Sequence, residues 1–148
     1  MTMCDYFSAR DDATALLVLD EPGGPDPSVL DVVPLKGVDP VVVLAQLEAV
    51  LTGCSYAEAA TRPRSGELVS SPEDEGAFVI AVSDSLQRAL AQADPAALRA
   101  AAAPWALTDE LRAAGVTPET AAETVTLLSG LASRATGSGD RLYCWWAV

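Results

Sequence analysis

The side chains that could carry chemistry in this chain are carboxylates, arginines, hydroxyls and thiols, because the sequence contains no histidine. Without histidine, the Ser-His-Asp and Cys-His arrangements are excluded and the commonest zinc ligand is absent. No C-x-x-C pair, Walker loop, dinucleotide-binding glycine fingerprint or kinase signature is present. We therefore expect no metal ion and no cofactor, and any catalysis would depend on carboxylates.

Two aspartates interrupt segments that otherwise have the composition of apolar strands, Asp5 in residues 3–8 and Asp31 in residues 29–35. If these carboxyls lay close together, the pKa of one would rise and the pair could act as acid and base. Strand alternation also places such residues on a solvent face without any chemistry. Asp5 and Asp31 are thus candidate catalytic residues, and separated, exposed carboxyls would exclude them.

The longest irregular stretch, residues 62–76, holds a second group of candidates. Arg62 and Arg64 flank Pro63 in an otherwise acidic chain, and together they could clamp an anion or a carboxylate. The alternative is two solvated loop arginines. The acidic residues at 67 and 73–75 lack the spaced pattern of a calcium loop, which indicates a solvated charge run.

Most of the large aromatic surface lies in the second half of the chain, and Trp105, Tyr143 and Trp145 are candidate binding residues. Tyr143 and Trp145 share one face of the last predicted strand, whereas Trp146 points the other way. We expect Trp146 in the core and Trp145 at an interface. Core packing of all these rings is the alternative.

The number of cysteines indicates in which cellular compartment the protein is expected. Cys4, Cys54 and Cys144 are an odd number in a chain without a basic leader or a membrane-spanning apolar run. This pattern predicts free thiols in the reducing cytoplasm. We expect Cys144 to be a buried, inert thiol.

The best-marked element is a helix over residues 38–53. Asp39 can cap it, Pro40 fits its first position and Gly53 suits its end. Apart from Gln46, Glu48 and Thr52 this helix is apolar on nearly all sides, so we expect it inside the protein.

The remaining elements do not alternate regularly between strand and helix. Strands are predicted at residues 3–8, 29–35, 77–82 and 141–148. A helix is predicted at 13–20, where a strand is the alternative, and further helices start at 55 and at 83. Helices are also predicted at 94–103, where Pro104 ends the helix, at 108–114, and from 117 to a turn at 137–140. The order predicts one α+β domain over residues 1–148, with a small mixed or antiparallel sheet of about four strands packed against several helices. Residues 54–76 are expected to form a long irregular loop with one short helix.

The formal net charge of −12 repels phosphate backbones and anionic lipid surfaces. Nucleic acid and membranes are therefore not expected as partners. A basic protein partner is compatible with this charge.

Several segments resemble the YfbM-like bacterial domains of unknown function. The start CDYFSARDDA resembles their strand, serine cap and first helix, and LAQLEAVLTG is similar to their central helix. AFVIAVSDSLQRALAQADPAALRA and the helix before RLYCWWAV are similar to the later elements. The aromatic residues of that central helix and the aromatic-glycine stretch before the third strand are missing here. The resemblance implies a small cytosolic α+β domain and no catalytic residue.

Three functions remain open from the sequence. The first is a cytoplasmic binding or interaction protein for a protein partner, a second copy or a small ligand. The second is a small carboxylate-dependent hydrolase that uses Asp5, Asp31 or the acidic loop. The third is an acidic accessory or immunity-type protein that blocks a basic partner.

Overall fold

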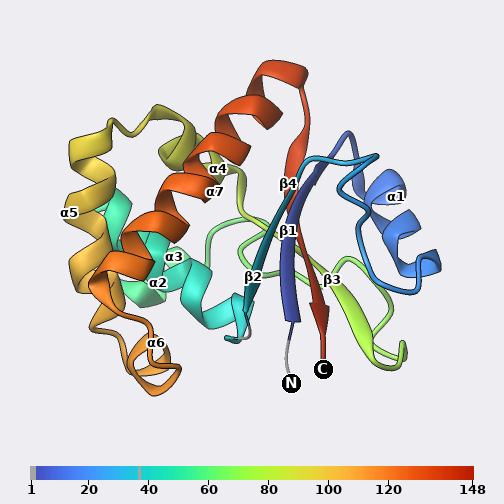
Figure 1. Ribbon diagram of the computed structural model, residues 1–148, viewed down its shortest axis with the longest axis horizontal. Coiled ribbons are helices and arrows are strands. Elements are labelled where there is room, and N and C mark those ends of the chain that lie inside the picture. The colour runs from blue at the N-terminus through green and yellow to red at the C-terminus, as the bar shows by residue number, and fades with distance from the viewer. Residues whose placement is uncertain (1–2, 37) are drawn as a thin grey trace.

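The computed structural model describes residues 3–36 and 38–148, and an antiparallel sheet runs through the middle of the described chain (Figure 1). Its strands are β1 (Met3–Ala9), β2 (Val32–Lys36), β3 (Ala77–Ala81) and β4 (Arg141–Ala147), in the order β2-β1-β4-β3. Every neighbouring pair is antiparallel. The predicted α+β class and the four-stranded sheet are confirmed, in the antiparallel form.

The helices lie on both faces of this sheet (Figure 1). They are α1 (Asp12–Ala15), followed by the 3-10 helix η1 (Leu16–Asp20), α2 (Pro40–Thr52), α3 (Tyr56–Ala60), α4 (Asp84–Gln92), α5 (Pro95–Ala106), α6 (Asp109–Ala113) and α7 (Pro118–Ser138). One face carries the large layer built from α2, α4, α5 and α7, and the other carries α1 and η1.

Strand alternation sorts the sheet side chains between these two layers. Tyr6 and Cys144 face the large helical layer and belong to its core. Phe7, Tyr143 and Trp145 face the opposite side and pack with α1 and η1 in a smaller core. Helices cover both faces of β1 and β4, which explains why both faces carry apolar side chains.

Helix α2 lies within the helical layer, as its composition predicts. Asp39 accepts a hydrogen bond from the Val41 amide, Pro40 occupies the first turn and Gly53 closes the helix at φ 69°. Val43, Leu44 and Leu47 are buried, and Glu48 is buried with them. The predicted boundaries of this helix are confirmed to within two residues.

Three predicted boundaries are wrong, each for a local reason. The second strand starts at Val32 and not at residue 29, because the amides of Val29 and Leu30 donate to the Asp26 carbonyl and close a turn. Helix α5 continues past Pro104 to Ala106, since proline in the last turn loses only one hydrogen bond. Helix α7 extends through Ser138 and ends at the left-handed Gly139.

The segment after α3 follows the outer edge of β3. The Ala81 amide donates to the Glu67 carbonyl at 2.8 Å, and the Val69 amide donates to the Val79 carbonyl at 2.8 Å. Leu68 forms a single antiparallel bridge with Ile80. This irregular segment therefore covers an edge that would otherwise expose unpaired backbone groups.

Candidate functional site

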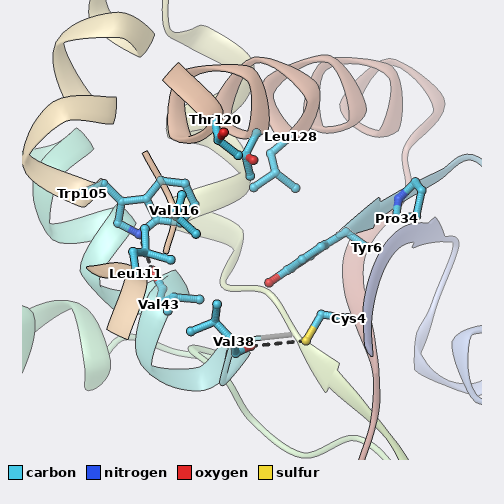
Figure 2. Close-up of a pocket in the computed structure, with 11 residues that line it drawn as sticks. Cys4, Tyr6, Pro34, Val38, Val43, Trp105, Leu111, Val116, Thr120 and Leu128 are labelled. Carbon is cyan, nitrogen blue, oxygen red and sulfur yellow. Dashed lines mark hydrogen bonds between the residues drawn. The ribbon is translucent and has the colours of Figure 1, made fainter. Parts of the chain in front are cut away.

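A pocket opens between the sheet and the helical layer, where β1, α2, α6 and α7 meet (Figure 2). Its volume is about 250 Å³. The apolar part of its lining is Pro34, Val38, Val43, Trp105, Leu111, Val116 and Leu128. Its polar part consists of Cys4, Tyr6, Thr120 and Thr124, so none of the described residues that line it is charged.

Helix α7 contributes one side of this pocket through a stripe of every fourth residue. Thr117 caps the helix by accepting from the Thr120 amide at 3.1 Å, and Pro118 starts its first turn. Residues four apart lie on one helical face, which places Thr120, Thr124 and Leu128 along the pocket.

Strand β1 contributes the inner wall. Cys4 and Tyr6 are two residues apart, so both point to the helical side of the sheet. The Tyr6 side chain is 4% exposed, and Figure 2 shows its hydroxyl pointing away from the strand into the pocket. Burial raises the pKa of Tyr6 well above its usual value, so the hydroxyl stays protonated.

Two other polar groups at the pocket are already hydrogen-bonded. The Cys4 thiol donates to the Val38 carbonyl at 3.3 Å, and the Trp105 indole nitrogen donates to the Val43 carbonyl at 3.0 Å. Trp105, predicted as a binding residue, thus forms a wall of the pocket and fixes α5 to α2. The arrangement suits an uncharged, mainly apolar molecule.

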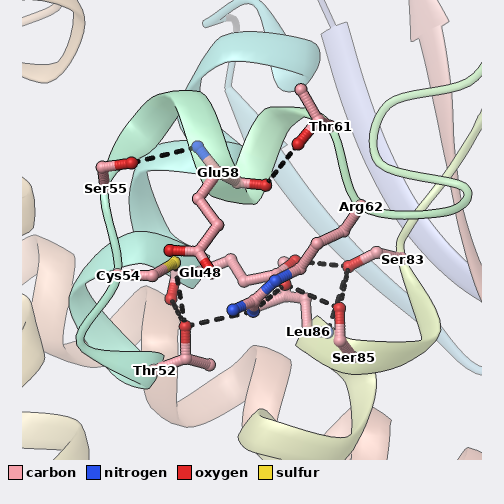
Figure 3. Close-up of polar contacts among 10 residues, drawn as sticks. All are labelled: Glu48, Thr52, Cys54, Ser55, Glu58, Thr61, Arg62, Ser83, Ser85 and Leu86. Atoms are coloured by element: carbon pink, nitrogen blue, oxygen red, sulfur yellow. Dashed lines mark hydrogen bonds and ion pairs between the residues drawn. The ribbon is translucent and has the colours of Figure 1, made fainter.

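A second polar cluster surrounds the buried carboxylate of Glu48 (Figure 3). Glu48 is 1% exposed. Its Oε2 accepts from Arg62 Nη1 and from Ser85 Oγ, both at 2.6 Å. Its Oε1 accepts from the Ser83 hydroxyl, which also caps α4. All these contacts lie within the chain, so the cluster ties α2, the segment after α3 and α4 together.

The two candidate arginines point to different carboxylates and do not form one clamp. Arg62 binds Glu48, whereas Arg64 Nη2 lies 2.9 Å from Asp12 Oδ1. This corrects the expectation of a paired anion site. Each guanidinium group binds an internal carboxylate, and the two fasten the loop to α2 and to α1.

Asp12 also organises Tyr143 on the far face of the sheet. The Tyr143 hydroxyl donates to Asp12 at 2.7 Å, and the Arg64 guanidinium lies 5.8 Å from the centre of the Tyr143 ring. The hydrogen bond from Arg64 lowers the pKa of Asp12, and burial raises that of Tyr143. Arg64 has φ 66°, the one positive φ of a non-glycine residue among those described. Tyr143, predicted as a binding residue, is fully buried here.

The structure does not bring Asp5 and Asp31 together. Asp5 lies on β1 opposite Pro34, while the Asp31 carbonyl accepts from the Ser8 amide, three residues further along the strand. The Asp31 carboxylate is paired with Arg134 at 2.5 Å. Asp5 is 9% exposed, and burial raises its pKa. The predicted acid–base pair of Asp5 and Asp31 is therefore not formed.

The expected roles of Trp145 and Trp146 are corrected by their burial. Trp145 is 6% exposed and lies in the smaller core, beneath the loop that contains Gly24. Trp146 is only partly buried against the helical core, beside Phe78. The predicted exposed interface at Trp145 is wrong, because α1, η1 and the following loop cover that face of the sheet.

Sequence reasoning missed Glu48, Tyr6 and Thr124. A signal for Glu48 was present, since a carboxylate in a helix that is apolar on all sides must be buried and must have partners. Tyr6 and Thr124 gave no such signal. Their importance arises only because β1 and α7 face each other across a cavity.

Comparison of the chain with protein-family models, with curated proteins and with solved structures finds no match. The resemblance to the YfbM-like domains therefore stays a prediction. Within residues 3–36 and 38–148, no three His, Cys, Asp or Glu side chains are grouped closely enough to hold a metal ion. In the same part of the chain, no helix has both the length and the apolar composition that crossing a bilayer requires.

Proposed function

We propose that this protein binds a small, uncharged and mainly apolar molecule in the pocket between the sheet, α2 and α7. The observation that supports this most directly is the volume of about 250 Å³ with a mainly apolar lining, in which none of the described side chains is charged. Protein interiors contain few voids larger than a water molecule. An apolar cavity of about 150 Å³ is already large enough to hold benzene.

The size of the pocket limits the ligand. Pockets for drug-sized ligands range from roughly 300 to 1,000 Å³, so this one suits a molecule with one or two rings or a short branched chain. Such a ligand has few atoms with which to gain binding energy, and we expect a dissociation constant in the micromolar range. The three free thiols support a cytoplasmic location, where they would remain reduced.

The hydrolase alternative has less support than binding. It depended on Asp5, on Asp31 or on the acidic loop at 67–75. Asp5 and Asp31 lie apart, and none of these carboxylates is among the described residues that line the pocket. The four polar residues of the described lining are a thiol and three hydroxyls, and no carboxylate is among them. A site of this composition can hold a molecule but offers no group that would activate water.

Filling the pocket tests the proposal. Thr124 lines the pocket, whereas Thr126, two residues away on the same helix, is exposed and donates to the Ala122 carbonyl. We expect Thr124→Trp to occupy the ligand's space and to weaken binding of naphthalene at least about tenfold, as a steric clash would. The matched variant Thr126→Trp is expected to bind naphthalene like the wild type.

Binding is measured by titrating naphthalene into ¹⁵N-labelled protein and following amide shifts in β1, α2 and α7. Saturable shifts in these elements, lost only in Thr124→Trp, are the expected result. The absence of saturable shifts in the wild-type protein, or equal loss in both tryptophan variants, would contradict the proposed binding site.

A further inference from the structure

The Tyr6 hydroxyl is a hydrogen-bond donor that opens onto the pocket and has no strong acceptor among the described residues. Within the described residues, no nitrogen or oxygen atom forms a hydrogen bond with the Tyr6 hydroxyl, although the residue is 4% exposed. The polar group that contacts it is the Cys144 thiol, from the residue directly opposite on β4. Sulfur is a weak acceptor, and buried tyrosine hydroxyls usually have a better partner.

The other hydroxyls of the pocket have less need of a ligand. Thr120 is exposed, and its hydroxyl accepts from the Thr117 hydroxyl at 3.1 Å. Thr124 is half-buried, so water can reach it. Tyr6 is the most buried residue of the three, and its O–H group points into the pocket.

We infer that the ligand carries one carbonyl oxygen, as in a small ketone, aldehyde, ester or amide, and that Tyr6 donates a hydrogen bond to it. The inference rests on the proposed function, because it names the chemistry of the molecule held in that pocket. An acceptor on the ligand would satisfy the donor that the described residues leave without a nitrogen or oxygen partner. The remainder of such a molecule would contact the valines, Trp105 and Leu128.

A carboxylate does not fit this position. None of the described residues that line the pocket is an arginine or a lysine, and the carboxylate of Asp39 is near the Tyr6 hydroxyl. An anion placed there would be desolvated and repelled without a cation to pair with it. Neutral carbonyl compounds need only one donor, and Tyr6 supplies it.

The test compares two ligands of nearly equal shape, acetophenone and α-methylstyrene, which differ in having C=O or C=CH₂. Their affinities for the wild type, Tyr6→Phe and the control Tyr56→Phe are measured by the same amide titration. Tyr56 is on the exposed surface of α3. One hydrogen bond corresponds to about a 3- to 10-fold change in affinity.

We expect Tyr6→Phe to weaken acetophenone about 3- to 10-fold and to leave α-methylstyrene within about twofold, with Tyr56→Phe altering neither. The infrared carbonyl stretch of bound acetophenone should lie at lower frequency in the wild type than in Tyr6→Phe. Equal effects of Tyr6→Phe on both ligands, or an unchanged carbonyl stretch, would overturn the inference while leaving the pocket intact. Failure of both ligands and of naphthalene to bind the wild type would overturn the proposed function itself.

Discussion

Asp5 is a buried carboxylate that forms no ion pair with the described side chains. It lies on β1 between Pro34 of β2 and Trp145 of β4, and none of the ion pairs in the described chain includes it. Burial raises its pKa, so the folded protein holds the Asp5 proton more tightly than the unfolded chain does. The stability that this proton contributes is present below the unfolded pKa of about 3.9 and is lost as pH rises through the folded pKa.

Replacing Asp5 with asparagine should therefore stabilise the protein at neutral pH. We expect Asp5→Asn to raise the urea midpoint at pH 7 and to lose most of this advantage near pH 3.5, where the wild-type carboxyl is protonated. Asp31→Asn is the control, since it removes an exposed pair with Arg134 and should change the midpoint little, if anything downward. A lower midpoint for Asp5→Asn at pH 7 would show that the carboxylate has a stabilising role.

At the scale of elements, the loop after η1 holds the smaller core in place through a close backbone approach. Gly24 has φ 80°, and a Cβ atom there would lie 2.6 Å from Cδ2 of the Trp145 indole. Gly53 has a similar φ of 69° at the end of α2, but a Cβ there would meet no atom within 4 Å. Substitution of either glycine would cause backbone strain, but only substitution of Gly24 would also cause a steric clash.

We expect Gly24→Ala to cost clearly more stability than Gly53→Ala. Strain in the left-handed region costs about 1–2 kcal/mol in each case, and displacement of Trp145 adds a further ~1–3 kcal/mol only in Gly24→Ala. Urea unfolding followed by tryptophan fluorescence measures both the midpoints and the change at Trp145. Equal losses for the two variants would mean that the loop yields without disturbing the indole.

At the scale of the whole molecule, 21 acidic residues outnumber 9 basic ones. Four carboxylates are within ion-pair distance of an arginine in the described chain: Asp12, Asp31, Glu48 and Asp84. Most of the negative charge therefore repels itself across the surface. The acidic-blocker function stays a prediction, and this surplus of charge is its basis.

Salt should stabilise this protein, because it screens the repulsion between surface carboxylates. We expect the free energy of unfolding to rise by on the order of 1 kcal/mol between 0.02 and 0.5 M NaCl at pH 7, as measured by urea denaturation. The same range should leave naphthalene binding unchanged, since naphthalene is uncharged and the described lining of the pocket carries no charged side chain. A fall in stability with salt would mean that the internal ion pairs outweigh the repulsion.

The sequence by itself determined the local elements of this protein. Helix caps at Asp39, Ser83 and Thr117 and the apolar pattern of β3 depend on residues within about four positions of one another, and they predicted the right types of element. Their irregular order was sufficient for the α+β class. Local signals misplaced element ends at the turn after Asp26, at Pro104 in the last turn of α5 and at the end of α7, which continues to Ser138.

Only the tertiary structure decided which side chains meet. Glu48 binds Arg62, 14 residues away, and Ser83, 35 residues away, while Tyr6 shares its pocket with Trp105 and Thr124. The alternation of β4 correctly separated Trp145 from Trp146, but it could not say which face lies under α1 and which under the helical layer. The spacing of apolar residues along a strand indicates that one of its faces is buried. Which side chains pack against that face depends on strand order and helix packing, which involve residues far apart in the chain.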